Sequence, residues 1–103
     1  SGGFDYKNNV IEVNGMVSQK VKIKNPTGLH LRPAGVLCKN AIEYGSVITF
    51  KYGGENIANA KSVLSVLGAC IKSGDEIELI CEGEDEQKAL EEMVALIESG
   101  LGE

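Results

Sequence analysis

One short stretch of the chain contains both its only histidine and its only arginine. It reads Asn25-Pro26-Thr27-Gly28-Leu29-His30-Leu31-Arg32-Pro33-Ala34-Gly35. Apolar residues alternate with polar ones before the stretch and recur at spacings of three and four after it, so the stretch marks a change from strand to helix. Imidazole is the side chain that normally titrates near neutral pH, which makes His30 the first candidate for chemistry. The alternative is that His30 only caps a helix or lies in a loop.

The residues before and after this stretch indicate where the strand ends and where the helix begins. Residues 17–23 alternate apolar and polar side chains, as a half-buried strand does. From Leu31 to about Glu43 the apolar residues follow the period of a helix. Pro33 is tolerated only in the first turn of a helix, where its missing N–H would have no acceptor. The helix is therefore expected to begin within a residue or two of His30.

The rest of the chain predicts five further elements. They are strands at 47–52 and 55–58 joined by Gly53-Gly54, a helix at 62–69, a strand at 76–81 and a helix at 84–98. The order β-α-β-β-α-β-α predicts an α+β fold. We expect an open-faced two-layer sandwich, in which a four-stranded, mostly antiparallel sheet has three helices on one face.

The N-terminal segment differs in character from the rest of the chain. Ser-Gly-Gly is typical of a cloning scar, and Asn14-Gly15 predicts a turn just before Met16. Apolar residues on both sides of Asn8-Asn9 predict a hairpin. We expect residues 1–15 to be an N-terminal extension or expression-tag residue, and residues 16–103 to form one domain.

Composition excludes several classes of function. The formal net charge of −5 argues against a nucleic-acid binder, which would present a basic face. No apolar run approaches the roughly 20 residues that span a membrane, and no leader precedes a cleavage-like site, so we expect a cytoplasmic protein without membrane insertion. The segment from Lys20 to Lys39 has five Lys/Arg and no acid, a polarity that suits a phosphate or an acidic partner.

The cysteines do not suggest a metal site or a disulfide framework. Cys38, Cys70 and Cys81 are odd in number, far apart, and without a C-x-x-C pair. We expect all three to be structural, with Cys81 a small buried side chain on its strand, and we expect no cofactor and no metal. A hydrolytic site is also disfavoured, since no serine or cysteine lies beside a His-acid pair in sequence.

The surroundings of His30 predict an anion site. The first N–H groups of a helix point outward without acceptors, and the helix dipole favours negative charge there. Arg32 adds a permanently charged, bidentate donor, and Gly28 lets the preceding loop bend. We therefore hypothesise that His30 takes up a phosphoryl group and gives it away again.

The motif Gly28-Leu29-His30-Leu31-Arg32-Pro33-Ala34, the later Ala60-Lys61-Ser62 and the order of elements closely resemble the HPr family. This is the family of histidine-containing phosphocarriers of the bacterial phosphoenolpyruvate-dependent sugar phosphotransferase system. The resemblance covers roughly residues 16–103. It implies that His30 carries phosphate on its Nδ1 atom and that Arg32 stabilises the phosphoryl group. It also implies a donor, Enzyme I, and an acceptor, the A domain of a sugar-specific Enzyme II, so the protein would be a carrier rather than an enzyme.

The resemblance implies a second site at Ser62. In Gram-positive-type members, a serine here is phosphorylated by HPr kinase/phosphorylase, and the context Lys61-Ser62-Val63-Leu64 and the tail Gly100-Leu101-Gly102-Glu103 resemble that branch. The alternative is that Ser62 only caps its helix.

Other functions remain as alternatives to the carrier. One is a regulatory module that acts through phospho-Ser62 on a catabolite-repression transcription factor, although paralogues of that kind typically lack the histidine. Another is a small-molecule-binding α+β domain, which only the general fold supports.

The docking surface for partners is predicted beside the two sites. Leu29, Leu64 and Leu67 are the candidates, and the alternative is that they are core. For Val66, on the inner side of the second helix, we expect the core.

Overall fold

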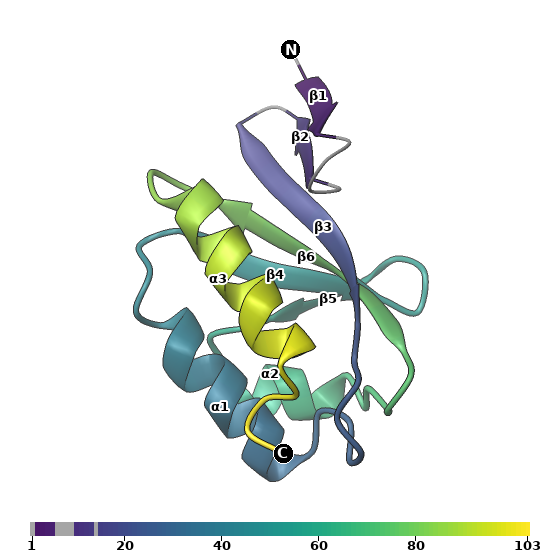
Figure 1. Cartoon of the computed structure of the whole chain (residues 1–103). Coiled ribbons are helices and arrows are strands. Elements are labelled where there is room, and N and C mark those ends of the chain that lie inside the picture. Colours follow the sequence, from purple (N-terminus) through teal and green to yellow (C-terminus); the bar gives the residue numbers. More distant parts are fainter. Residues whose placement is uncertain (1, 6–9, 14) are drawn as a thin grey trace.

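The strands and helices form two layers. The structure, a computed structural model, describes residues 2–5, 10–13 and 15–103. The order over these residues is β1 (Gly2–Asp5), β2 (Val10–Val13), β3 (Met16–Lys22), α1 (Leu31–Ala41), β4 (Val47–Tyr52), β5 (Asn56–Asn59), α2 (Val63–Gly68), β6 (Glu76–Glu82) and α3 (Glu86–Glu98). The strands in the described part form one antiparallel sheet in the order β1-β2-β3-β6-β4-β5. Its three helices lie on one face (Figure 1), which confirms the predicted α+β open sandwich.

The sheet is wider than predicted, because the N-terminal residues add to it. Strands β1 and β2 pair with each other, and β2 pairs with the outer edge of β3, with Ile11 opposite Ser18. The described residues therefore give six strands instead of the expected four. Val10 is buried and belongs to the core, which helps to hold β2 in place. The predicted hairpin is confirmed for 2–5 and 10–13, while its turn at Asn8-Asn9 lies outside the described residues.

The core follows from the predicted periodicities. On β6, the middle strand between β3 and β4, the residues Ile77, Leu79 and Cys81 are buried and alternate with more exposed neighbours. The buried stripe of α3 packs over β3 and β6 and consists of Ala89, Leu90, Met93, Val94 and Ile97. These residues confirm the apolar patterns from which the strand and the helix were predicted.

Two helices begin where their sequence signals place them. The first helix, α1, starts at Leu31 with His30 as its N-cap, and α2 starts after Ser62, its N-cap. The third helix begins at Glu86, two residues later than predicted. Its N-cap, Asp85, instead turns its carboxylate toward the segment after α1.

The Asp85 carboxylate anchors that segment to α3. It accepts hydrogen bonds from the N–H of Gly45 at 3.0 Å and the N–H of Ser46 at 2.9 Å, and also from the Ser46 hydroxyl. These hydrogen bonds, above all the one from the Ser46 hydroxyl, lower the pKa of Asp85 below its usual value. Asp85 is thus a structural anchor between α3 and the segment after α1.

The three cysteines divide into two groups. Cys38 and Cys81 are buried, and burial raises the pKa of both thiols, that of Cys81 to about 12. Cys81 is therefore the small buried side chain that was predicted. Cys70 is exposed, with a backbone φ of +55°, so unlike the other two it does not contribute to the core. Its thiol lies at the surface because the chain turns sharply here after α2.

None of the helices in residues 2–5, 10–13 and 15–103 has both the length and the apolar character needed to cross a membrane.

Candidate functional site

Two loops meet at the end of the sheet and carry the site. One loop runs from β3 to α1 and the other from α2 to β6. The N–H of Leu29 donates to the carbonyl of Ile71 at 2.9 Å. The N–H of Ile23 donates to the carbonyl of Asp75 at 2.8 Å, and the N–H of Gly74 donates in return to the carbonyl of Ile23 at 2.7 Å. These backbone bonds fix the loop that delivers His30.

Gly28 is required at the crossing of the two loops. Its φ is +68°, and an added Cβ would lie 2.5 Å from the carbonyl oxygen of Ile71 and 2.8 Å from the Cα of Lys72. Both contacts are backbone atoms, which cannot move aside as a flexible side chain can. A glycine therefore satisfies both the backbone conformation and the close approach. This confirms the predicted role of Gly28 in bending the loop.

His30 occupies the N-terminal end of α1. Its backbone is extended, with φ −75° and ψ −176°, and its side chain makes no capping hydrogen bond. The imidazole is exposed. Its backbone carbonyl accepts from the N–H of Ala34 at 2.8 Å, as the N-cap residue of a helix does.

The first turn of α1 presents a small set of donors beside this ring. The N–H groups of Leu31 and Arg32 have no acceptor within the helix, because they belong to its first turn. Pro33 has no N–H at all. The exposed guanidinium of Arg32 belongs to the same turn. Backbone dipole and side-chain charge therefore favour an anion at this end of the helix.

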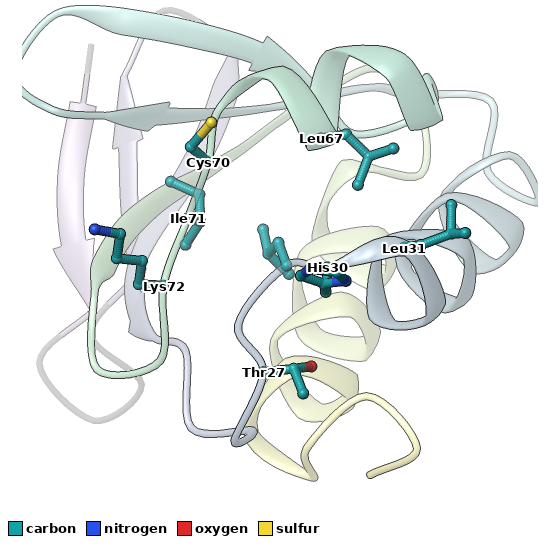
Figure 2. Close-up of a pocket in the computed structure, with 8 residues that line it drawn as sticks. Thr27, His30, Leu31, Leu67, Cys70, Ile71 and Lys72 are labelled. Atoms are coloured by element: carbon teal, nitrogen blue, oxygen red, sulfur yellow. The ribbon is translucent and has the colours of Figure 1, made fainter.

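A cavity of about 490 Å³ opens next to His30. Figure 2 shows His30 at its centre, Thr27 below, Leu31 and Leu67 on one side, and the Cys70–Lys72 segment on the other. The lining is mostly apolar, with an imidazole, a thiol and the Lys72 ammonium as its ionisable groups. The structure thus brings the predicted residues Leu29, His30 and Leu67 to one cavity, while Arg32 does not line it.

Sequence reasoning missed the contact that Glu103 makes near the site. The Glu103 side chain reaches back to the loop before His30, where its Oε1 atom accepts from Asn25 Nδ2 at 3.0 Å. The same oxygen accepts from Thr27 Oγ1 at 2.8 Å and from the N–H of Thr27 at 3.4 Å. Hydrogen bonds from Asn25, and then from Thr27, lower the pKa of the Glu103 carboxyl. The Arg32 guanidinium adds a smaller electrostatic lowering of the same pKa.

The local signal for this contact is Leu101, which has a glycine on each side. It is fully buried, has a φ of +53°, and donates its N–H to the carbonyl of Leu96. An apolar residue just after a helix often packs back in this way. The predicted short tail is thereby folded against the body of the protein.

The predicted docking residues behave differently from one another. Leu64 is 83% exposed and Leu67 is half-buried, as expected of contact residues, whereas Leu29 is only 3% exposed. The docking prediction is wrong for Leu29, because its backbone bond to Ile71 turns the side chain into the core. Leu31, at 63% exposure, is an apolar surface residue beside His30 that was not among the candidates. Val66 is fully buried, as predicted.

Ser62 is the N-cap of α2. Its hydroxyl accepts from the N–H of Ser65 at 3.2 Å, and the side chain is half-buried. The adjacent Lys61 directs its ammonium group elsewhere, to the carbonyl of Tyr44 at 2.7 Å. Capping by Ser62 is confirmed, and its modification stays a prediction.

Known proteins share this arrangement. Residues 17–99 match the family model described as "PTS HPr component phosphorylation site". The chain is 37% identical over 83 residues to HPr-like protein Crh of Bacillus subtilis, across 81% of this chain and 96% of that protein. It is 38% identical over 89 residues to phosphocarrier protein HPr of Lysinibacillus sphaericus, across 85% of this chain and 100% of that protein.

A solved structure agrees with these relatives. The crystal structure of HPr-C-His from Thermoanaerobacter tengcongensis superposes with a TM-score of 0.79 and 36% identity, covering 84% of this chain and 96% of that one. The family match spans most of the chain, and the relatives are covered almost completely. The chain therefore belongs to the HPr family, the non-catalytic phosphocarriers of the phosphotransferase system.

Proposed function

We propose that His30 accepts a phosphoryl group from phospho-Enzyme I and passes it to the A domain of a sugar-specific Enzyme II. The observation that supports this most directly is an exposed imidazole at the N-cap of α1, with no capping bond of its own. Family membership supports partners within the phosphotransferase system. We place the reaction in the cytoplasm and the carrier domain at residues 16–103, with residues 1–15 as an extension.

The transfer uses few groups. The lone pair of His30 Nδ1 attacks phosphorus, and the P–N bond forms as the bond between phosphorus and the donor breaks. The donor's leaving atom keeps that electron pair. The N–H groups of Leu31 and Arg32 and the Arg32 guanidinium stabilise the negative charge on the phosphoryl oxygens. In the second step the acceptor's nucleophile attacks phosphorus, and the electron pair of the P–N bond returns to His30.

The exposed leucines suit alternating partners. Leu31 and Leu64 offer apolar contact area on the helices that carry His30 and Ser62. A carrier must release each partner after transfer, and a small apolar contact near the reacting atom allows short-lived complexes. Leu67, half-buried in the wall of the cavity, adds to this surface.

The test is incubation with Enzyme I and phosphoenolpyruvate, followed by intact mass measurement. Wild type should gain one phosphate that is acid-labile and base-stable, and His30→Ala should gain none. Ser62→Ala is the matched control, because it removes the other proposed phosphate site and should label like wild type. If wild type takes up no phosphate from a competent Enzyme I, the proposal is wrong.

We further propose that HPr kinase/phosphorylase phosphorylates Ser62 with ATP as donor. The N-cap position supports this, since backbone donors at the start of α2 favour an anion. The phosphate adds about two negative charges near the docking leucines, so it should hinder docking of an acidic partner. The kinase should give an acid-stable phosphate on His30→Ala, and equal labelling of Ser62→Ala would remove the assignment.

The second candidate function is regulatory. The similarity to HPr-like protein Crh, described in a solved structure as a Bacillus subtilis catabolite repression protein, supports a module that acts through phospho-Ser62 on a catabolite-repression transcription factor. The presence of His30 favours the carrier. The two functions separate in a binding assay: tight binding of the transcription factor only to the Ser62-phosphorylated protein, together with no phosphate on His30, would favour the regulator.

A further inference from the structure

In the described part of the chain, the sheet ends in a short strand on each side. Its outermost strands, β1 and β5, have four residues each, whereas β3 has seven. An edge strand offers unpaired N–H and C=O groups to any second strand, and a short edge strand limits this risk. Gly2 and Gly3 weaken β1 further as a pairing partner, because glycine is disfavoured in strands. Without β1 and β2, the edge on this side would be the longer β3.

Strand β2 covers the part of the β3 edge that has no charge. It pairs with residues 16–18, which are Met, Val and Ser. The remainder of β3 contains Lys20 and Lys22, and both are exposed. Lysines on an edge strand are another common protection against pairing with a second chain. The hairpin and the two lysines thus protect different halves of the same strand.

The side chain of Val10 anchors the hairpin to the rest of the protein. Val10 is 6% exposed, belongs to the core, and lines a cavity together with Gln19 of β3 and Val94 of α3. The next residue, Ile11, points to the opposite face of the strand and is 36% exposed. A two-stranded hairpin is at best marginally stable by itself. Loss of the Val10 contact should therefore release β2 from β3.

Strand β3 is complementary to a second copy of itself. In an antiparallel pairing centred on Gln19, Val17 lies opposite Val21 and Lys20 lies opposite Ser18. Both lysines of the strand then face uncharged residues, so the repulsion of like charges directly opposite each other is avoided. The lysines alone therefore do not prevent this pairing, and the cover that β2 provides is needed.

We propose that β2 is a removable cap on the edge of β3, and that this edge binds β3 of a second copy of the chain once the cap leaves. With the hairpin docked, the protein is a monomer. With the hairpin released, two copies join their sheets around a two-fold axis. Figure 1 shows the hairpin at the start of β3, at the opposite end from the loop that precedes α1. Its release therefore leaves the loop of His30 in place, and the proposal does not depend on phosphoryl transfer.

The first test compares full-length wild type with Val10→Lys and Ile11→Lys by sedimentation velocity over a series of protein concentrations. The exposed Glu91 and Glu98 of α3 lie beside Val10 and would repel those of a second copy, so the buffer contains about 0.5 M NaCl to screen them. Burial of a valine favours the docked hairpin by roughly tenfold or more. Val10→Lys should therefore lower the dissociation constant of the dimer by at least about tenfold.

Two variants make this test specific. Ile11→Lys adds the same charge on the exposed face of β2 and should behave like wild type. Val10→Ala only shortens the anchor, so it should shift the dissociation constant in the same direction as Val10→Lys even if the lysine variant does not fold. If both Val10 variants are as monomeric as Ile11→Lys, the proposal is wrong.

The second test asks whether the dimer uses the edge of β3. Hydrogen exchange at the amides of residues 16–18 should be faster in dilute Val10→Lys than in wild type, and should slow again at concentrations where the variant dimerises. Adding Ser18→Lys to Val10→Lys puts a lysine opposite Lys20 of the second copy, so the double variant should return to the monomer. A dimer that forms without protecting residues 16–18, or that persists in the double variant, would overturn the proposed pairing.

Discussion

Replacing Gly28 by alanine should lower the free energy of unfolding by about 2 to 5 kcal/mol, the sum of two costs. The positive φ of +68° costs a residue with a Cβ about 1 to 2 kcal/mol. The new Cβ would also lie 2.5 Å from the Ile71 carbonyl oxygen and 2.9 Å from the Lys72 carbonyl carbon. Relieving such overpacking typically costs about 1 to 3 kcal/mol. The Leu29-to-Ile71 hydrogen bond lies in the region that must shift.

Urea unfolding followed by far-UV circular dichroism measures this loss. With a slope of about 1.5 kcal/mol per molar, a loss of about 3 kcal/mol lowers the midpoint by about 2 M. Two other glycines separate the causes. Gly54 has a φ of +93° but no atom within 4 Å of its Cβ position, so Gly54→Ala should show only the conformational cost. Gly35 lies within α1 with open space and no positive φ, so Gly35→Ala should gain about 0.5 to 1 kcal/mol.

The comparison between Gly28→Ala and Gly54→Ala shows whether the close approach of residues 71–72 adds to the cost of the positive φ. If Gly28→Ala costs no more than Gly54→Ala, the backbone of residues 71–72 does not approach Gly28 as closely as described. The reasoning that links the two loops to the position of His30 would then be wrong.

Three further outcomes are expected. Ser62→Ala should lose about 1 kcal/mol of stability in urea unfolding because α2 loses its cap, while Ser62→Asp, which can still cap, should lose much less. The pKa of Asp85 in the folded protein lies below the usual 3.8. The stabilisation that its ionised carboxylate gives to the fold is therefore present above pH 3.8, and it is lost as the pH falls through the folded pKa. The melting temperature of Asp85→Asn should therefore lie below that of wild type at pH 7, with a gap that narrows as the pH falls below 3.8; a gap independent of pH would contradict this. A thiol reagent should modify Cys70 in the native protein and reach the buried Cys38 and Cys81 only in urea, so early modification of either would show that it is accessible.

The elements were predictable because their signals are local. The alternation of β6 and the position of Pro33 are contained in a few neighbouring residues, and they placed the strand and the start of α1 correctly. The start of α3 was not predictable in this way, because Asp85 bonds to residues 45–46, about 40 positions earlier. The width of the sheet was missed because two short N-terminal strands gain their place only by pairing with β3.

The features of the site also fall into two groups, those that neighbouring residues predict and those that depend on distant contacts. The N-cap position of His30 and the need for Gly28 follow from neighbouring residues, and the structure agrees with both. The contact from Glu103 to Asn25 joins positions 78 apart in sequence. The apolar Leu101 indicates locally that the tail folds back, but no neighbouring residue predicts that the Glu103 carboxylate reaches Asn25. The burial of Leu29 likewise depends on its bond to a second, distant loop. The direction of a side chain in a loop therefore depends on the other segments of the chain that pack against the loop.

The position of β6 has a consequence for how the protein is made. The two halves of the main sheet, β3 on one side and β4 with β5 on the other, are joined through a strand that lies at residues 76–82. A nascent chain that stops short of this strand has no hydrogen-bonded link between those halves. At about 5–20 residues per second, synthesis adds a delay of seconds between the appearance of His30 and that of β6. During that delay the loop of His30 also lacks Ile71, its backbone partner, so the geometry of this loop arises only after residue 71 has been synthesised.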